Sequence, residues 1–143
     1  MHDSATEEMS MYTGGCLCGK VRFEIKGPIK DIVYCHCSQC RKVQGSAFAT
    51  NGVVKADEFA IVSGEEALRA YQYGPGKVKY FCSACASPMF SRNAALPDVV
   101  RIRLGTLEGE VAERPWCHIF VGSKANWYEI SDDLPQYDGF PEG

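Results

Sequence analysis

Two short cysteine motifs, Gly15-Cys16-Leu17-Cys18-Gly19 and Cys82-Ser83-Ala84-Cys85, lie far apart in the chain and serve the same chemistry. In a C-x-C motif on an extended segment both sulfurs point to the same side. A C-x-x-C motif on a tight turn directs both of its sulfurs at one ion. Four thiolates complete the tetrahedral coordination that Zn²⁺ adopts in a structural site. The two motifs therefore predict a closed zinc site that holds distant parts of the chain together.

A third motif, Cys35-His36-Cys37-Ser38-Gln39-Cys40, supplies three more sulfurs within one short segment. Three protein ligands leave a fourth position on Zn²⁺ for water or a substrate sulfur, as in a catalytic site. His36 alternates with the ligands and is expected to point away from their metal. Cys117 could complete a second closed site, but it precedes an apolar run, so we interpret it as a buried thiol.

The cysteine content also bears on the compartment. The chain has eight cysteines, and residues 1–11 are polar, without the apolar segment of a secretion signal. We therefore expect a cytoplasmic protein whose thiols stay reduced. Clustered reduced thiols are more often metal ligands or catalytic groups than disulfide partners. A thiol redox protein is the alternative, but it would leave most of the cysteines without a role.

Length and charge narrow the class of protein further. A chain of 143 residues and 15.8 kDa has the size of one domain. We divide it into a flexible leader, 1–11, and a single zinc-binding domain, 12–143. The net charge of −3 speaks against a nucleic-acid partner. No apolar run approaches the ~18 residues of a membrane helix, so no membrane partner is expected.

Short apolar alternations separated by turn residues predict an all-β fold. The clearest alternation is Val21–Ile25, and Asn51-Gly52 is interpreted as a turn. Helix is expected for a turn or two through Gln39–Gln44. The other expected strands are Ile32–Tyr34, Ala47–Asn51, Phe59–Val62, Leu68–Tyr73, Val78–Phe81, Val99–Leu104, His118–Val121 and Trp127–Ile130.

The cysteine motifs occur along the chain together with other short sequence motifs. These are Gly-Gly-Cys-Leu-Cys-Gly at 14–19, Cys-His-Cys-Ser-Gln-Cys-Arg-Lys at 35–42, Phe-Cys-Ser-Ala-Cys at 81–85, His-Ile-Phe-Val-Gly-Ser-Lys at 118–124 and Asp-Asp-Leu-Pro at 132–135. Together they resemble the glutathione-dependent formaldehyde-activating enzyme family, from Gly14 to about Glu142. The resemblance implies an all-β, Mss4-like fold of zinc-stapled antiparallel sheets with short connecting turns. It also implies two zinc ions, a structural one on Cys16, Cys18, Cys82 and Cys85 and a catalytic one on Cys35, Cys37 and Cys40.

The resemblance further implies a carbon–sulfur lyase or synthase. In the family reaction, glutathione and formaldehyde combine reversibly to give S-(hydroxymethyl)glutathione. A metal-bound thiol is deprotonated, so an open zinc suits capture of the substrate thiol. The two carboxylates of glutathione need cations, and Arg41, Lys42 and Lys124 are candidates, although each alone is also explained as a solvated surface charge. His118 is interpreted either as a proton shuttle or as a packing residue.

A non-catalytic, zinc-stapled protein-interaction module is the alternative function. A fourth protein ligand on the second zinc would favour it. Trp116 and Trp127 are interpreted as core residues rather than as walls of a pocket. Ala86 follows the last cysteine of its motif, where members of the family often carry a Gly that serves a positive φ angle.

Overall fold

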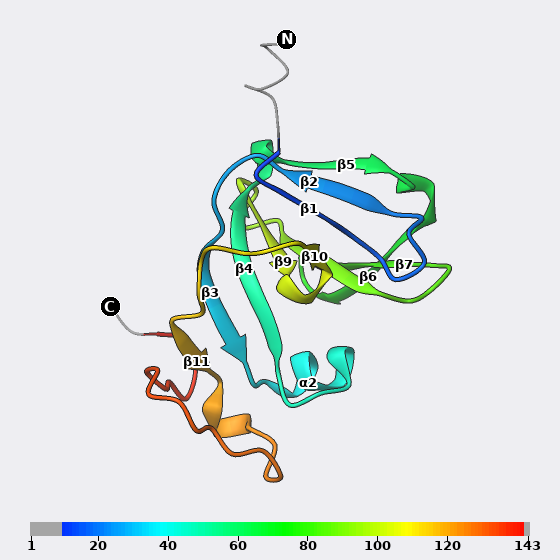
Figure 1. Ribbon diagram of the computed structural model, residues 1–143. Coiled ribbons are helices and arrows are strands. Elements are labelled where there is room, and N and C mark those ends of the chain that lie inside the picture. Colours follow the sequence, from blue (N-terminus) through cyan, green and yellow to red (C-terminus); the bar gives the residue numbers. More distant parts are fainter. Residues whose placement is uncertain (1–9, 142–143) are drawn as a thin grey trace.

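A computed structural model describes residues 10–141, which form two β-sheets packed face to face (Figure 1). The smaller sheet has four antiparallel strands in the order β10-β1-β2-β5. Its strands are β1 (Tyr12–Gly15), β2 (Arg22–Ile25), β5 (Phe59–Ser63) and β10 (Leu107–Glu108).

The larger sheet has seven strands in the order β11-β3-β4-β9-β8-β7-β6. Its pairs are antiparallel except at one edge, where β11 runs parallel to β3 and departs from the expected all-antiparallel arrangement. The strands are β3 (Lys30–Cys35), β4 (Ala49–Lys55), β6 (Leu68–Gly74), β7 (Lys77–Cys82), β8 (Pro88–Asn93), β9 (Val99–Arg103) and β11 (Cys117–Ile119).

Helix is scarce, as expected of an all-β fold. Within residues 10–141 the one α-helix is α2 (Ser38–Gln44), at the predicted place. Four single 3₁₀ turns connect other elements in this range, and they are η1 (Ala56–Glu58), η2 (Glu65–Ala67), η3 (Leu104–Thr106) and η4 (Val121–Ser123). No helix in the described part of the chain is long and apolar enough to cross a membrane.

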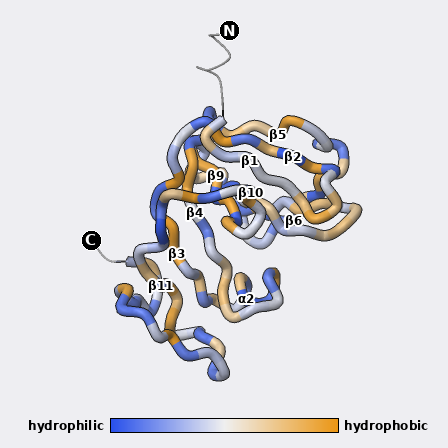
Figure 2. The backbone as a smooth tube through the Cα atoms, in the orientation of Figure 1, coloured by the Kyte–Doolittle hydropathy of each residue, from blue (hydrophilic) through white to orange (hydrophobic). Residues whose placement is uncertain are grey.

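The main core lies between the two sheets. Phe23 and Ile25 of β2 are buried there against residues of the larger sheet such as Val54, Val100 and Ile102. Apolar and polar residues alternate along β2 and β9, because successive side chains of a strand point to opposite faces (Figure 2). The larger sheet therefore has an inner face that packs in the core and an outer face that is free for other side chains.

Several expectations about local structure are corrected. Asn51-Gly52 is not a turn but lies within β4, paired with Ile102 and Arg103 of β9. Gly52 is needed there because the Ile29 side chain crosses it closely, a usual reason for glycine inside a strand. The segment Trp127–Ile130 is not a strand, and β1, β8 and β10 were not expected.

Most of the predicted leader, residues 1–9, lies outside the described residues. Ser10 and Met11, at its end, are hydrogen-bonded to β2. The Ser10 hydroxyl donates to the Glu24 carboxylate at 2.7 Å, and the Met11 N–H donates to the Ile25 carbonyl at 2.8 Å.

The close crossing at Gly52 gives a stability prediction. In Gly52→Ala, the new Cβ would lie 2.4 Å from Ile29 Cγ2 and 3.1 Å from Leu104 Cδ1, so we expect a loss of about 1–3 kcal/mol from overpacking. Urea unfolding at constant metal content measures this loss. Gly105→Ala is the control, because a Cβ there would have no heavy atom within 4 Å. Equal losses in the two variants would contradict the argument.

Candidate metal centres and an adjoining pocket

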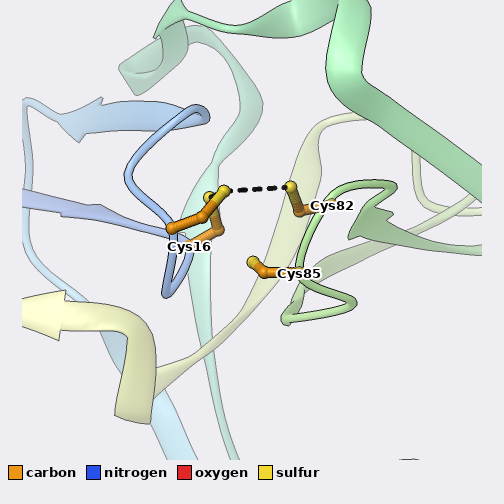
Figure 3. A group of neighbouring side chains, drawn as sticks. Cys16, Cys82 and Cys85 are labelled. Atoms are coloured by element: carbon orange, nitrogen blue, oxygen red, sulfur yellow. Dashed lines mark hydrogen bonds between the residues drawn. The ribbon is translucent and has the colours of Figure 1, made fainter.

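The first cysteine cluster joins the two sheets. Cys16 and Cys18 lie on the turn between β1 and β2, Cys82 is the last residue of β7, and Cys85 lies on the turn that follows; Figure 3 shows Cys16 facing Cys82 and Cys85. The Cys18 Sγ atom is 3.6 Å from Cys16 Sγ and 3.8 Å from Cys82 Sγ. A tetrahedral Zn²⁺ with bonds of about 2.3 Å requires sulfurs about 3.8 Å apart. The cluster therefore has the size of a closed tetrahedral metal site.

Polar hydrogens around this cluster point at the sulfurs. The backbone N–H groups of Val21 and Ala84 donate to Cys16 Sγ at 3.3 Å and to Cys82 Sγ at 3.4 Å. The Ser87 hydroxyl, 3.2 Å from Cys85 Sγ, lowers the pKa of that thiol to about 5. These contacts favour thiolates, the form in which cysteine binds metal.

Ala86 ends this turn with φ of +69°, the conformation in which a Gly was expected. Its N–H donates to the Cys82 carbonyl at 2.7 Å, so the turn keeps its hydrogen bond without a glycine.

The second cluster is built at the start of α2. Cys35 ends β3, Cys37 is the N-cap of α2, and Cys40 lies in its first turn. Their ligand atoms lie within 4.8 Å of one another, and no fourth His, Cys, Asp or Glu of residues 10–141 joins them. The Cys37 sulfur accepts the N–H of Cys40 at 3.3 Å. Hydrogen bonds from Cys35 and Cys40 lower the pKa of Cys37, whereas the contact with Cys37 raises the pKa of Cys35, so without a cation the negative charge gathers on Cys37. A bound cation would stabilise the other thiolates as well.

Cys117 is a member of neither group of clustered sulfurs, although it packs in the same buried apolar group as Cys35 and Cys40. It is fully buried in β11, where burial raises the pKa of its thiol. This placement agrees with its interpretation as a buried thiol.

A pocket of about 260 Å³ adjoins the second cluster on the outer face of the larger sheet. Cys35, Cys37 and Cys40 line one side of it. Four cationic side chains and one carboxylate also line it, and these are Lys77, Lys79, Arg101, Arg103 and Asp31. Apolar walls come from Val33, Val53, Ile119, Phe120 and Phe140. The pocket can therefore hold a polar, anionic molecule next to three sulfurs.

Arg103 is the most buried of these cations. Only 5% of its surface is exposed, and burial lowers the pKa of its guanidinium. Its Nη1 atom lies 3.5 Å from Ser91 Oγ, and no carboxylate of the described residues forms a salt bridge with it. Burial also lowers the pKa of Lys79, whose Nζ lies 4.1 Å from the centre of the Tyr73 ring.

The three cations proposed from sequence do not line this pocket. Arg41 and Lys42 lie in α2, and Lys124 donates from Nζ to the carbonyls of Ala125 and Tyr128. The pocket cations that sequence reasoning missed occur as pairs two residues apart, at 77 and 79 and at 101 and 103. Such spacing places both members of a pair on one face of a strand. That periodicity is the signal by which they could have been found.

Two histidines and an aspartate form a hydrogen-bonded series next to the second cluster, starting from His36 between Cys35 and Cys37. His36 Nε2 and His118 Nδ1 are 2.8 Å apart, and His118 Nε2 lies 3.0 Å from Asp132 Oδ2. Both imidazoles are buried, and burial followed by the neighbouring His118 lowers the pKa of His36 to about 4. As expected, His36 is not a member of the metal cluster. His118 does not line the pocket, so its position supports a packing and positioning role.

The two tryptophans are not core residues. Trp116 is 40% exposed and Trp127 is 71% exposed, and neither lines the pocket. The expectation of core packing is therefore wrong for both.

An all-β scaffold with two cysteine clusters of metal-binding size, one of them beside a cationic pocket, defines the chain as a small cysteine-rich protein with candidate metal centres. The sequence pattern of the family described as "Glutathione-dependent formaldehyde-activating enzyme" matches residues 11–123. The chain belongs to this family.

Two relatives are similar over most of their length. A protein of Halomonas elongata, provisionally named a glutathione-dependent formaldehyde-activating enzyme, is 32% identical over 140 positions, which cover 90% of this chain and 88% of that protein. A crystal structure of a Rhodobacter sphaeroides protein, a structural genomics target, has 27% identity and a TM-score of 0.59. The match covers 73% of this chain and 98% of the other.

The different positions of the two clusters predict different effects of losing one ligand. Cys82→Ser should lower the melting temperature by at least about 10 °C, since a metal that joins two sheets contributes directly to folding free energy. Cys37→Ser should change the melting temperature much less and release metal from the second cluster alone. Thermal melting and metal per chain by mass spectrometry measure both effects. Equal losses of melting temperature would contradict this division.

The contact between Asp132 and His118 gives a pH prediction. The Leu134 N–H, and then His118, lower the pKa of the Asp132 carboxyl in the folded state. A lowered folded pKa contributes stability that is present above the unfolded pKa and is lost as pH falls. The gap in unfolding free energy between wild type and Asp132→Asn should therefore be largest near pH 7 and shrink below about pH 4. Urea unfolding at several pH values tests this, with the exposed neighbour Asp133→Asn as control; a gap that widens in acid would refute it.

Proposed function

We propose that this protein makes and breaks the carbon–sulfur bond between a glutathione-type thiol and formaldehyde or another small aldehyde. The observation that carries the proposal is the juxtaposition of three clustered sulfurs and a cation-lined pocket. The pocket offers charge for an anionic thiol, and the sulfur cluster offers a place for a metal with an open position. Family membership supports the same chemistry.

We propose zinc as the metal in both clusters. Four sulfurs at tetrahedral separations fit a closed zinc site on Cys16, Cys18, Cys82 and Cys85. The donor set of Cys35, Cys37 and Cys40 fits a zinc with one open position. Zinc bound there would favour the thiolate form of a substrate thiol.

The reaction balances without any other reactant. The substrate sulfur bonds to the aldehyde carbon, the carbonyl π bond breaks, and the thiol proton ends on the former aldehyde oxygen. The reverse reaction breaks the carbon–sulfur bond and regenerates thiol and aldehyde. In either direction, the cationic side chains hold the substrate's anionic groups, and the apolar walls formed by Val33, Ile119 and Phe120 exclude water from beside the sulfurs.

The activity is tested by exchange NMR between glutathione, formaldehyde and S-(hydroxymethyl)glutathione. Zinc-loaded protein should accelerate the exchange above the uncatalysed rate. Because metal-ion catalysis is worth several kcal/mol, Cys40→Ser should lower kcat/KM by at least about a hundredfold.

Cys117→Ala is the matched control, since it removes a buried thiol that belongs to neither cluster. It should keep the wild-type rate. No acceleration by folded protein that carries metal in both clusters would refute the proposed function.

A further inference from the structure

We propose that Arg103 and Lys79 form a carboxylate-binding subsite that holds the thiol substrate by its acidic groups, independently of its sulfur. This inference rests on the proposed function and assigns the specificity of that site to two residues. It predicts that the protein selects thiols that carry two carboxylates and rejects small neutral thiols.

The burial of Arg103 is the first argument. A buried guanidinium without an acidic partner is costly, because desolvation of its charge is not offset by a salt bridge. In the described part of the chain, the Arg103 guanidinium has no carboxylate partner and only the Ser91 hydroxyl as a hydrogen-bond partner, at a long 3.5 Å. Its anionic neighbours are the sulfurs of Cys40 and Cys35, whose charge a bound metal would largely neutralise. A substrate carboxylate in the pocket would supply the missing partner and can bind the planar guanidinium with two parallel hydrogen bonds.

The strand register is the second argument. Cys35 pairs with Ala49, and two residues further along β4, Asn51 pairs with Arg103. Arg101 and Lys79 both pair with Ser91, and so they share one row across β7, β8 and β9.

Strand geometry turns this register into distances along the sheet. One step of two residues is about 6.6 Å along a strand, and neighbouring strands lie about 4.8 Å apart, so the backbone of Arg103, one step along and two strands across from Cys35, lies about 12 Å from it. The backbones of Arg101 and Lys79 lie farther away, two steps along the strands and two and four strands across the sheet. All three side chains line the same pocket as the cysteines. The arrangement suits an elongated ligand with its thiol at the cysteines and its acidic groups farther across the sheet.

The balance of charge is the third argument. Three thiolates with a divalent ion keep one negative charge, and Asp31 adds another, whereas four cations line the pocket. The four positive charges therefore outnumber the two negative charges that the metal-bound cluster and Asp31 would carry. The remaining positive charge favours a ligand with more than one negative group.

The test uses S-methylglutathione, which has both carboxylates but no free thiol, and measures its affinity for the zinc-loaded full-length protein by calorimetry. Wild type should bind it, more weakly as NaCl rises. Arg103→Met should weaken binding about tenfold to a hundredfold, as expected for a lost hydrogen bond between charged groups. Arg103→Lys keeps the positive charge but loses the paired N–H groups of the guanidinium, so its affinity should lie between those of wild type and Arg103→Met.

Arg69→Met is the matched control, because Arg69 is exposed on β6 and donates only to the carbonyls of Glu66 and Leu68. Its affinity should equal that of wild type. If melting shows that Arg103→Met does not fold, Lys79→Met against the exposed Lys55→Met carries the comparison, with a loss of affinity expected only for Lys79→Met.

The dimethyl ester of S-methylglutathione separates charge from shape. It should not compete with the diacid, and equal binding of ester and diacid would overturn the proposal. No binding of the diacid to wild type, or an unchanged affinity in folded Arg103→Met, would also overturn it. Binding of the diacid that depends on Arg103, without carbon–sulfur exchange, would support the subsite and refute the proposed function. Carbon–sulfur exchange that does not depend on Arg103 would support the proposed function and refute the subsite.

Discussion

The approach of four cysteine sulfurs across the gap between the sheets is the contact on which the rest of this structure depends. The turn that carries Cys16 and Cys18 belongs to the smaller sheet, and the end of β7 and the turn after it, which carry Cys82 and Cys85, belong to the larger one. A metal ion bound by these sulfurs would cross-link the two layers and add to the stability that the core between them supplies. The inner face of the larger sheet packs in that core.

The outer face of the same sheet is thereby left for chemistry. Along β9, Val100 and Ile102 point into the core while Arg101 and Arg103 point into the pocket. A single alternating strand thus packs the core with one face and lines the pocket with the other. The cysteine loop is placed at the end of this face by β3 and is supported from behind by the buried pair of His36 and His118.

Sequence reasoning reached the parts of the site that are local in the chain. The spacing within 35–40 was sufficient to predict a cluster of three sulfurs, because those residues are neighbours whatever the fold. Arg103 was missed because its environment comes from strands distant in the sequence, and Arg41 and Lys42 were preferred because they follow the cysteines directly. Asn51-Gly52 was misjudged for the same reason, since a turn signal says nothing of the Ile29 side chain that crosses the strand.

The parallel pairing of β3 with β11 has a consequence for how the molecule is assembled. All four sulfurs that join the sheets are present once Cys85 has been made, whereas the pocket is not complete until Ile119 and Phe140 reach it. At about 5–20 residues per second, synthesis from Cys85 to Phe140 takes about 3–11 s. During that interval a nascent chain already contains all four sulfurs of the first cluster, while the pocket beside the second cluster still lacks the side chains of Ile119 and Phe140.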